Sequence, residues 1–134
     1  MAQSGTRLTP VARKVRKGFL ALDGVLESAG IFAEEDAFWV NGKEIGYFAD
    51  GGEVLGLRLT KREISAGRAA LKADSRVVLK ASSDWLHVRI SKPSDAALAL
   101  ELAALAVQAH RPSPGTPAAL PPMGAKLERM RRFH

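Results

Sequence analysis

The stretch from residue 37 to 59 constrains the fold most, because two turn sequences separate its short apolar runs. Asn41-Gly42 is the strongest two-residue hairpin signal, since both residues tolerate positive φ. Asp50-Gly51-Gly52 marks a second reversal of the chain. The last run places alternate leucines on one face of an extended strand: Leu55, Leu57 and Leu59. The stretch therefore predicts three antiparallel strands in a meander.

The glycines of this stretch do not form a nucleotide-binding loop. A phosphate-binding loop needs glycines at the mouth of a helix that follows a buried strand, with a lysine and a hydroxyl at fixed positions. The stretch has no such arrangement. We interpret Gly46 and Gly56, which interrupt strands, as positions of a bulge or of a close backbone approach.

The N-terminal part contains a good helix start. Thr9 can cap a helix whose first position is Pro10, where the missing amide proton costs nothing. An apolar stripe follows, made of Val11, Val15, Phe19, Leu20 and Leu22. Gly18 weakens the middle of this helix. Residues 23–32 are open to two interpretations: a strand that starts near Val25 and ends near Gly30, or a continuation of the helix.

A second helix and a second pair of extended segments follow the meander. Thr60 and Glu63 form a plausible capping box for a helix that Gly67 ends or bends. The segments "SRVVLKA" and "WLHVRI" then read as extended. The second of these alternates between an inward apolar set, Leu86, Val88 and Ile90, and an opposite set, Trp85, His87 and Arg89.

The segment "KPSDAALALELAALAVQAHR" is the clearest helix. We expect Ser94 to cap it, with Asp95 in the first turn. Its larger apolar residues cover much of the circumference, so we expect burial against the sheet: Leu98, Leu100, Leu102, Leu105 and Val107. The prediction is an α+β fold, a small antiparallel sheet of about four to six strands packed against an N-terminal helix and this long C-terminal helix.

The 134 residues fit one domain with appendages. We expect a basic arm and helix over residues 1–22, an α+β core over 23–111, a linker over 112–122 and a basic amphipathic tail over 123–134. The linker holds five of the seven prolines, which predicts an extended, semi-rigid segment. A helix as short as the tail is marginal in water, so order there requires contact with its own domain, another subunit or a ligand.

The net charge of +6 is concentrated at the two ends of the chain. Residues 1–20 carry five basic residues and no acid, and residues 111–134 carry five against Glu128. The basic arms contain Arg13, Lys14, Arg16, Lys17, Arg129, Arg131 and Arg132. Such arms attract polyanions. The alternative is that they are solvated termini that keep the protein soluble.

Composition excludes several classes of site. The chain has no cysteine, which excludes disulfides, thiolate metal sites and thiol nucleophiles. No apolar run approaches the roughly 20 residues of a membrane helix. The N-terminus lacks the apolar segment of a secretory signal, so a cytoplasmic protein is expected. We read Glu34, Glu35 and Asp36 as a solvated turn, and expect neither a metal nor a cofactor.

Three motifs carry a family resemblance over about residues 23–110: "GKEIGY" with its acidic-glycine turn, "GRA", and "SSDWLHVRI" before an alanine- and leucine-rich helix. In this order they resemble the luciferase-domain family of small bacterial proteins. More loosely, the arrangement resembles MmcQ/YjbR-type and frataxin-like α+β domains, some of which are suspected of binding DNA or partner proteins.

The chain departs from the luciferase-domain pattern at its histidines. Members have a "GH-H-GD" run and a histidine pair upstream of "SGW". Here Tyr47 and Ala49 occupy the first run, and valines at 77 and 78 fall where the pair would align. No metal-binding or proton-shuttling role therefore transfers. Asp50 and Trp85 keep their matching places.

Two hypotheses of function follow. The favoured one is a noncatalytic binding module for nucleic acid or a protein partner, which uses the basic arms or the sheet face near Tyr47, Asp50, Trp85, His87 and Arg89. The alternative is a small or degenerate enzyme with a pocket between the sheet and the last helix. That alternative would gain support from Asp50, Asp84 and His87 lying within hydrogen-bonding reach.

Overall fold

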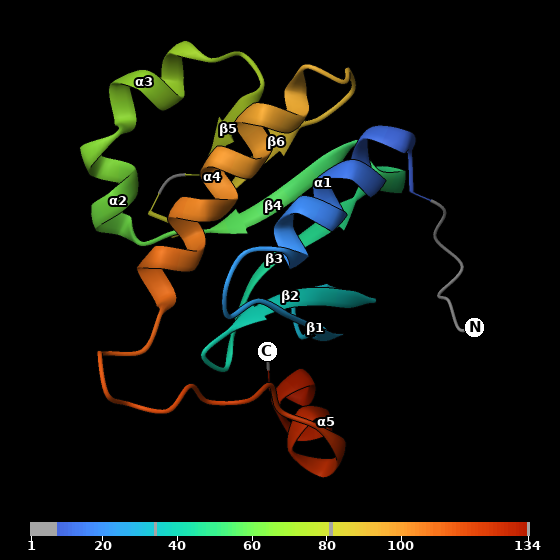
Figure 1. Ribbon diagram of the computed structural model, residues 1–134, viewed down its shortest axis with the longest axis vertical. Coiled ribbons are helices and arrows are strands. Elements are labelled where there is room, and N and C mark those ends of the chain that lie inside the picture. The colour runs from blue at the N-terminus through green and yellow to red at the C-terminus, as the bar shows by residue number, and fades with distance from the viewer. Residues whose placement is uncertain (1–7, 34, 81, 134) are drawn as a thin grey trace.

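The computed structural model describes residues 8–33, 35–80 and 82–133. Within these residues, a six-stranded antiparallel sheet in the order β1-β2-β3-β4-β6-β5 carries α1 and α4 on one face (Figure 1). We call this the inner face and the opposite one the outer face. The α+β fold predicted from the sequence is confirmed.

The elements follow one another along the chain as the Figure 1 labels show. The strands are β1 (Leu26–Ala29), β2 (Asp36–Val40), β3 (Lys43–Ala49), β4 (Val54–Arg58), β5 (Val77–Leu79) and β6 (Trp85–Arg89). The helices are α1 (Pro10–Leu20), the short 3-10 turn η1 (Asp50–Gly52), α2 (Lys61–Ala66), α3 (Arg68–Ala73), α4 (Asp95–His110) and α5 (Gly124–Arg132).

Both predicted reversals of the meander are present. Asn41 and Gly42, between β2 and β3, have φ of 51° and 73°. The three residues of η1 also have positive φ, which suits the glycines that hold two of the three positions. The predicted inward sets of β4 and β6 are fully buried in the core. The period-two pattern therefore identified the correct face of each strand.

The open question over residues 23–32 resolves as a strand. α1 ends at Leu20, and β1 pairs with β2 from Leu26 to Ala29. Val25, which precedes β1, is buried in the core. The alternative of a helix continued through this segment is wrong, because the chain turns at Gly24, where φ is 89°.

Two glycines permit close packing at α1. Thr9 caps the helix as predicted, and its Oγ1 accepts a hydrogen bond from the Ala12 amide at 3.1 Å. A Cβ on Gly18 would lie 2.7 Å from Leu100 Cδ1, so this glycine allows α1 to cross α4 closely. A Cβ on Gly46 would lie 2.9 Å from the ring of Phe19. Gly46 is thus a site of close approach. The register of β2 against β3 also shifts beside it, between Phe38 and Trp39, so both interpretations offered above apply.

The segment after β4 forms two short helices. Thr60 caps α2, and its hydroxyl accepts from the Glu63 amide at 3.0 Å. Gly67 separates α2 from α3, as the sequence predicted.

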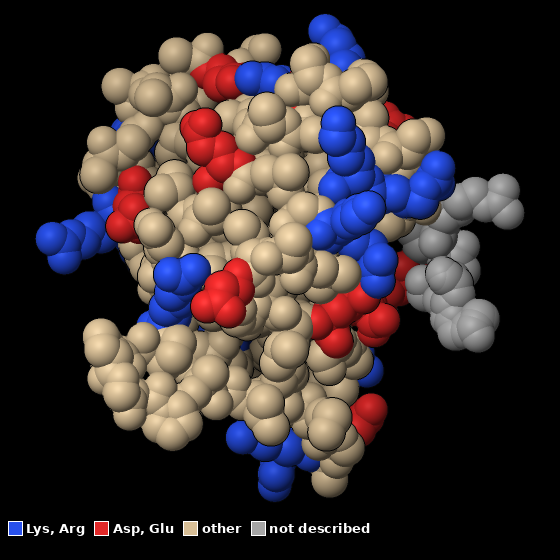
Figure 2. Space-filling model, viewed as in Figure 1, with Lys and Arg blue, Asp and Glu red and all other residues tan. Residues whose placement is uncertain are grey.

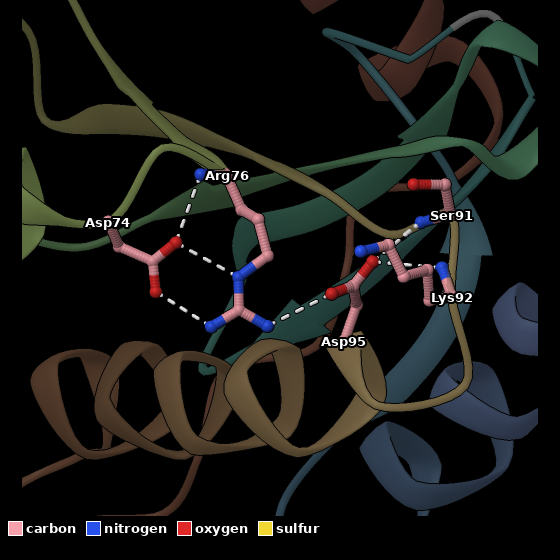
Figure 3. A network of polar contacts seen from close by, with 5 residues as sticks. All are labelled: Asp74, Arg76, Ser91, Lys92 and Asp95. Atoms are coloured by element: carbon pink, nitrogen blue, oxygen red, sulfur yellow. Dashed lines mark hydrogen bonds and ion pairs between the residues drawn. The ribbon is translucent and has the colours of Figure 1, made fainter.

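One expectation about α4 is wrong, and another is confirmed in part. Ser94 makes no side-chain cap; the carboxylate of Asp95 instead accepts from the amides of Ser91 and Lys92, each at 2.9 Å (Figure 3). The buried face is mostly alanine, and Leu105 is 39% exposed. Small side chains let α4 lie close to the sheet and to α1. Leu102 and Val107 are buried, and Leu98 and Leu100 pack against the core, so the expected burial holds for all but Leu105. The buried residues are Asp95, Ala96, Ala99, Leu102, Ala103, Ala106 and Val107.

Arg76 joins the start of β5 to the start of α4 (Figure 3). Its guanidinium donates to both oxygens of Asp74, at 2.9 and 2.7 Å, and to Asp95 Oδ1 at 2.9 Å. The hydrogen bonds from Arg76 lower the pKa of Asp74 to about 2. The Lys92 amide is the main cause of the lowered pKa of Asp95, which is 3% exposed. This ion-pair network links the start of β5 to the start of α4, and its charged groups are occupied with one another.

The chain after α4 runs without a helix or strand until α5, which lies near β1 and β2 (Figure 1). Ala119 donates its amide to Asn41 Oδ1 at 2.9 Å, and Arg131 Nε donates to the Gly30 carbonyl at 2.9 Å. Leu127 is buried. The tail thus contacts its own domain, one of the three alternatives above. No helix in the described part of the chain is long and apolar enough to cross a membrane.

Candidate functional site

The outer face of the sheet carries a group of side chains that we call the outer cluster, defined as Phe32, Tyr47, Arg58, Trp85 and His87. Tyr47, Gly56 and His87 are neighbours across β3, β4 and β6. A Cβ on Gly56 would lie 2.9 Å from Tyr47 Cζ and close to two more ring carbons. The ring of Tyr47 therefore packs over Gly56, so close approach is the one of the two interpretations offered for this glycine that applies.

Tyr47 is the centre of the outer cluster. Its ring centroid lies 5.2 Å from that of Trp85 and 6.3 Å from that of His87. Its Oη lies 3.4 Å from His87 Nε2. Partial burial raises the pKa of Tyr47 and lowers the pKa of His87, and the nearby Lys80 lowers the latter further. This neutral pair offers polarizable rings and hydrogen-bonding groups but no strong base.

Phe32 and Arg58 complete the outer cluster on the other side of Trp85. The Phe32 and Trp85 centroids are 5.1 Å apart, and the Arg58 guanidinium lies 5.6 Å from the first ring and 5.9 Å from the second. Such arginine-over-ring contacts are favourable cation–π geometry. Phe32 is 40% exposed, whereas Trp85 is 9% exposed because its neighbours cover it.

Sequence reasoning missed Phe32 and Arg58. The sequence did contain a signal for Arg58, because it lies between the inward Leu57 and Leu59 and must therefore point to the outer face. In the sheet it pairs with Trp85 on the neighbouring strand. Phe32 gave no such signal, since it lies in a loop outside the strands.

Glu44 determines the position of that loop. Its carboxylate, in a residue 2% exposed, accepts hydrogen bonds from the amides of Ile31, Phe32 and Ala33. A carboxylate that accepts several backbone amides is strongly held. Glu44 thus fixes the loop over the outer face and places the ring of Phe32 against Trp85.

Ser83, Asp84 and His87 lie close together in the sequence, but they do not form a catalytic arrangement. Ser83 Oγ accepts from the Trp85 amide at 3.0 Å, which is a turn contact, and Asp84 accepts from Arg58 Nε at 2.9 Å. Asp50 lies exposed at the start of η1 and acts on His87 only as a charge that raises its pKa. Arg89 is exposed, and its backbone pairs with Val54. Of the predicted binding residues, Tyr47 contacts both Trp85 and His87, whereas Asp50 and Arg89 lie on the margin.

The basic residues of the two arms lie in different places. Lys and Arg side chains gather over α1, on the inner side of the molecule (Figure 2). Arg13, Lys14 and Lys17 are exposed there, while Arg16 pairs with Glu27. The basic residues of α5 instead lie beside the outer face: Arg129 and Arg132 are exposed, and Arg131 binds the Gly30 carbonyl. The outer cluster is therefore adjacent to α5 and separated from α1 by the sheet.

A hollow of about 290 Å³ lies between Met130 of α5 and the outer face. We call it the α5 hollow. Its other lining residues include Ile31, Phe32, Trp39, Lys43 and Arg58. Phe32 and Arg58 belong both to this lining and to the outer cluster, so the two features form one continuous surface.

His110 belongs to the inner side, where its Nε2 contacts the carbonyls of Arg58 and Leu59 at 3.2 and 3.3 Å. Burial is the main cause of its lowered pKa. Among the described residues, no group of three or more histidines or carboxylates is arranged to hold a metal ion.

Comparison with known proteins gave no match among family models, curated proteins or solved structures. The resemblance to the luciferase-domain family therefore stays a prediction.

Proposed function

We propose that this protein is a noncatalytic binding module that takes single-stranded nucleic acid on the outer face of its sheet. The observation that carries the proposal is the outer cluster, in which the Tyr47 ring packs over Gly56 beside Trp85, Phe32 and the Arg58 guanidinium. Proteins bind unpaired bases by stacking them on aromatic rings and guanidinium planes displayed on a sheet.

Charge near the outer cluster supports the same proposal. Lys43 and Arg58 line the adjoining α5 hollow, and Lys80 lies close enough to lower the pKa of His87. Cations beside stacking rings give the salt-sensitive backbone contacts that single strands require. A cytoplasmic location and a distant relation to the luciferase-domain family are parts of this proposal that rest on the sequence alone.

A small enzyme remains the alternative, and it has less support. Acid–base work would need the carboxylate of Asp84 to reach His87, but Arg58 binds that carboxylate. His87 in turn contacts Tyr47, a neutral group. The inner face is filled by core side chains from α1 and α4, and the α5 hollow lies on the other side of the sheet from α4.

The test is fluorescence anisotropy of a labelled single-stranded oligonucleotide of about 12 residues, as RNA and as DNA, titrated with the full chain at several salt concentrations. We expect binding that weakens as salt rises. Tyr47→Ala should weaken it by about fivefold or more, because one stacking ring is lost.

The matched control is Tyr47→Phe, which keeps the ring and removes only the hydroxyl that contacts His87. We expect its affinity to stay within about twofold of wild type, since stacking does not use the hydroxyl. Absence of binding at low salt, or an equal loss in both variants, would contradict the proposal.

A further inference from the structure

We infer that the α5 hollow is a subsite for one unpaired base, with Met130 of α5 as its outer wall. This inference rests on the proposed function and adds where a base enters and which segment encloses it. The hollow is continuous with the outer cluster through Phe32 and Arg58, so a strand stacked on Tyr47 can place a neighbouring base there.

The walls of the hollow suit a planar ring. Ile31, Phe32 and Met130 supply apolar and aromatic surface, and Trp39, which is 1% exposed, also belongs to the lining. The indole nitrogen of Trp39 donates to the Ser28 carbonyl at 3.3 Å, which fixes the ring in the floor. Met130 has an unbranched thioether that adapts to rings of different shape. A wall of this kind favours stacking over hydrogen-bond readout, so we expect weak sequence preference.

The charges of the hollow suit a phosphate beside that ring. Lys43 and Arg58 are cationic lining residues. The carboxylate of Glu44 also reaches the hollow, but its oxygens accept the amides of the 31–33 loop. Those amides partly offset its negative charge, and Arg58 pairs with Asp84, so Lys43 is the lining cation that a nucleotide phosphate would meet.

Contacts on both sides of Met130 hold α5 in place as a wall. Leu127, one turn earlier, is buried, and Arg131 binds the Gly30 carbonyl next to the 31–33 loop. The linker is held by the bond from Ala119 to Asn41, at the turn that borders the hollow. The tail and the sheet therefore form two sides of one site.

The test uses the full chain and mononucleotides, with inorganic phosphate as the charge-only probe, measured by isothermal titration calorimetry. We expect nucleotides to bind more tightly than phosphate by about fivefold or more, since the base adds stacking. Met130→Trp fills the hollow and should abolish this difference. Met123→Trp, at an exposed position just before α5, is the matched control and should leave it unchanged.

A second substitution of Met130 distinguishes an effect on the hollow from a local change in the structure of α5. Met130→Glu puts a negative charge in the wall and should weaken nucleotide binding, whereas Met123→Glu should have a smaller effect. Equal binding of nucleotides and phosphate, or nucleotide binding unaffected by both Met130 variants, would overturn the inference. If oligonucleotides still bind the outer face in that case, the proposed function stands. If mononucleotides bind in the hollow and oligonucleotides do not bind, the proposed function fails alone.

Discussion

At the scale of single residues, glycines and acids determine where the larger side chains lie. Gly56 leaves room for the ring of Tyr47, and Gly46 leaves room for Phe19 on the opposite face. Glu44 holds the loop that presents Phe32. Each of these residues acts through another side chain, so its role depends on neighbours that are distant in the sequence.

Asp74 provides a residue-scale prediction. Hydrogen bonds from Arg76 hold its pKa at about 2 in the folded state, against an ordinary value of 3.8. A carboxyl with a lowered folded pKa stabilises the protein above its unfolded pKa, and this contribution is lost as the pH falls through the interval down to the folded pKa. Asp74→Asn should therefore be less stable than wild type near neutral pH, and the difference should shrink as the pH falls from about 4 toward about 2.

Urea unfolding at a series of pH values measures this difference. The exposed Asp23, in the turn after α1, offers a control: Asp23→Asn should follow wild type across the whole range. A constant difference between Asp74→Asn and wild type at every pH would show that the Arg76 contact does not hold the carboxylate.

At the scale of elements, the sequence predicts strands better than helix contacts. Asn41-Gly42 and the alternating leucines specify the meander because turn chemistry and period two are local properties. The burial of α4 is not local: its seven buried residues include four alanines, and Leu105 faces outward, because α1 and the sheet decide which stripe is covered. The position of the Asp95 carboxylate also depends on distant residues, because it binds Arg76, which precedes β5, besides the amides of Ser91 and Lys92 in the loop before α4.

The residues of the outer cluster also differ in whether local sequence patterns predict them. Strand alternation and a hairpin signal were enough to predict Tyr47, Trp85 and His87 from the sequence. Phe32 and the α5 hollow could not be predicted in this way, because both depend on segments that fold back over the sheet. Glu44 holds the 31–33 loop there, and Leu127 and Arg131 hold the tail.

An element-scale prediction concerns α5. A nine-residue helix is marginal in water, so the docked state depends on the burial of Leu127. Leu127→Ala should release α5, which hydrogen exchange would record as loss of amide protection over 124–132 while β3 and β4 keep theirs. Leu120→Ala is the matched control, since that leucine is 74% exposed. Unchanged protection in Leu127→Ala would mean that other contacts hold the tail.

At the scale of the whole molecule, the sheet separates two basic regions that the sequence leaves equivalent. The cations of α1 lie on the inner side, as Figure 2 shows, whereas α5 lies beside the outer face, where Met130 lines the hollow and Arg131 binds the Gly30 carbonyl. A net charge of +6 therefore does not act as one patch. We therefore propose that the ligand binds on the outer face beside α5, whereas α1 packs on the core and exposes its cations to solvent.

The most direct test of this assignment is an NMR titration of the labelled full chain with a single-stranded oligonucleotide. We expect shift changes that gather on the outer face, at Tyr47, Gly56, Trp85 and His87, with the backbone amides of α1 unchanged. Shift changes confined to α1, or no change anywhere at low salt, would contradict it.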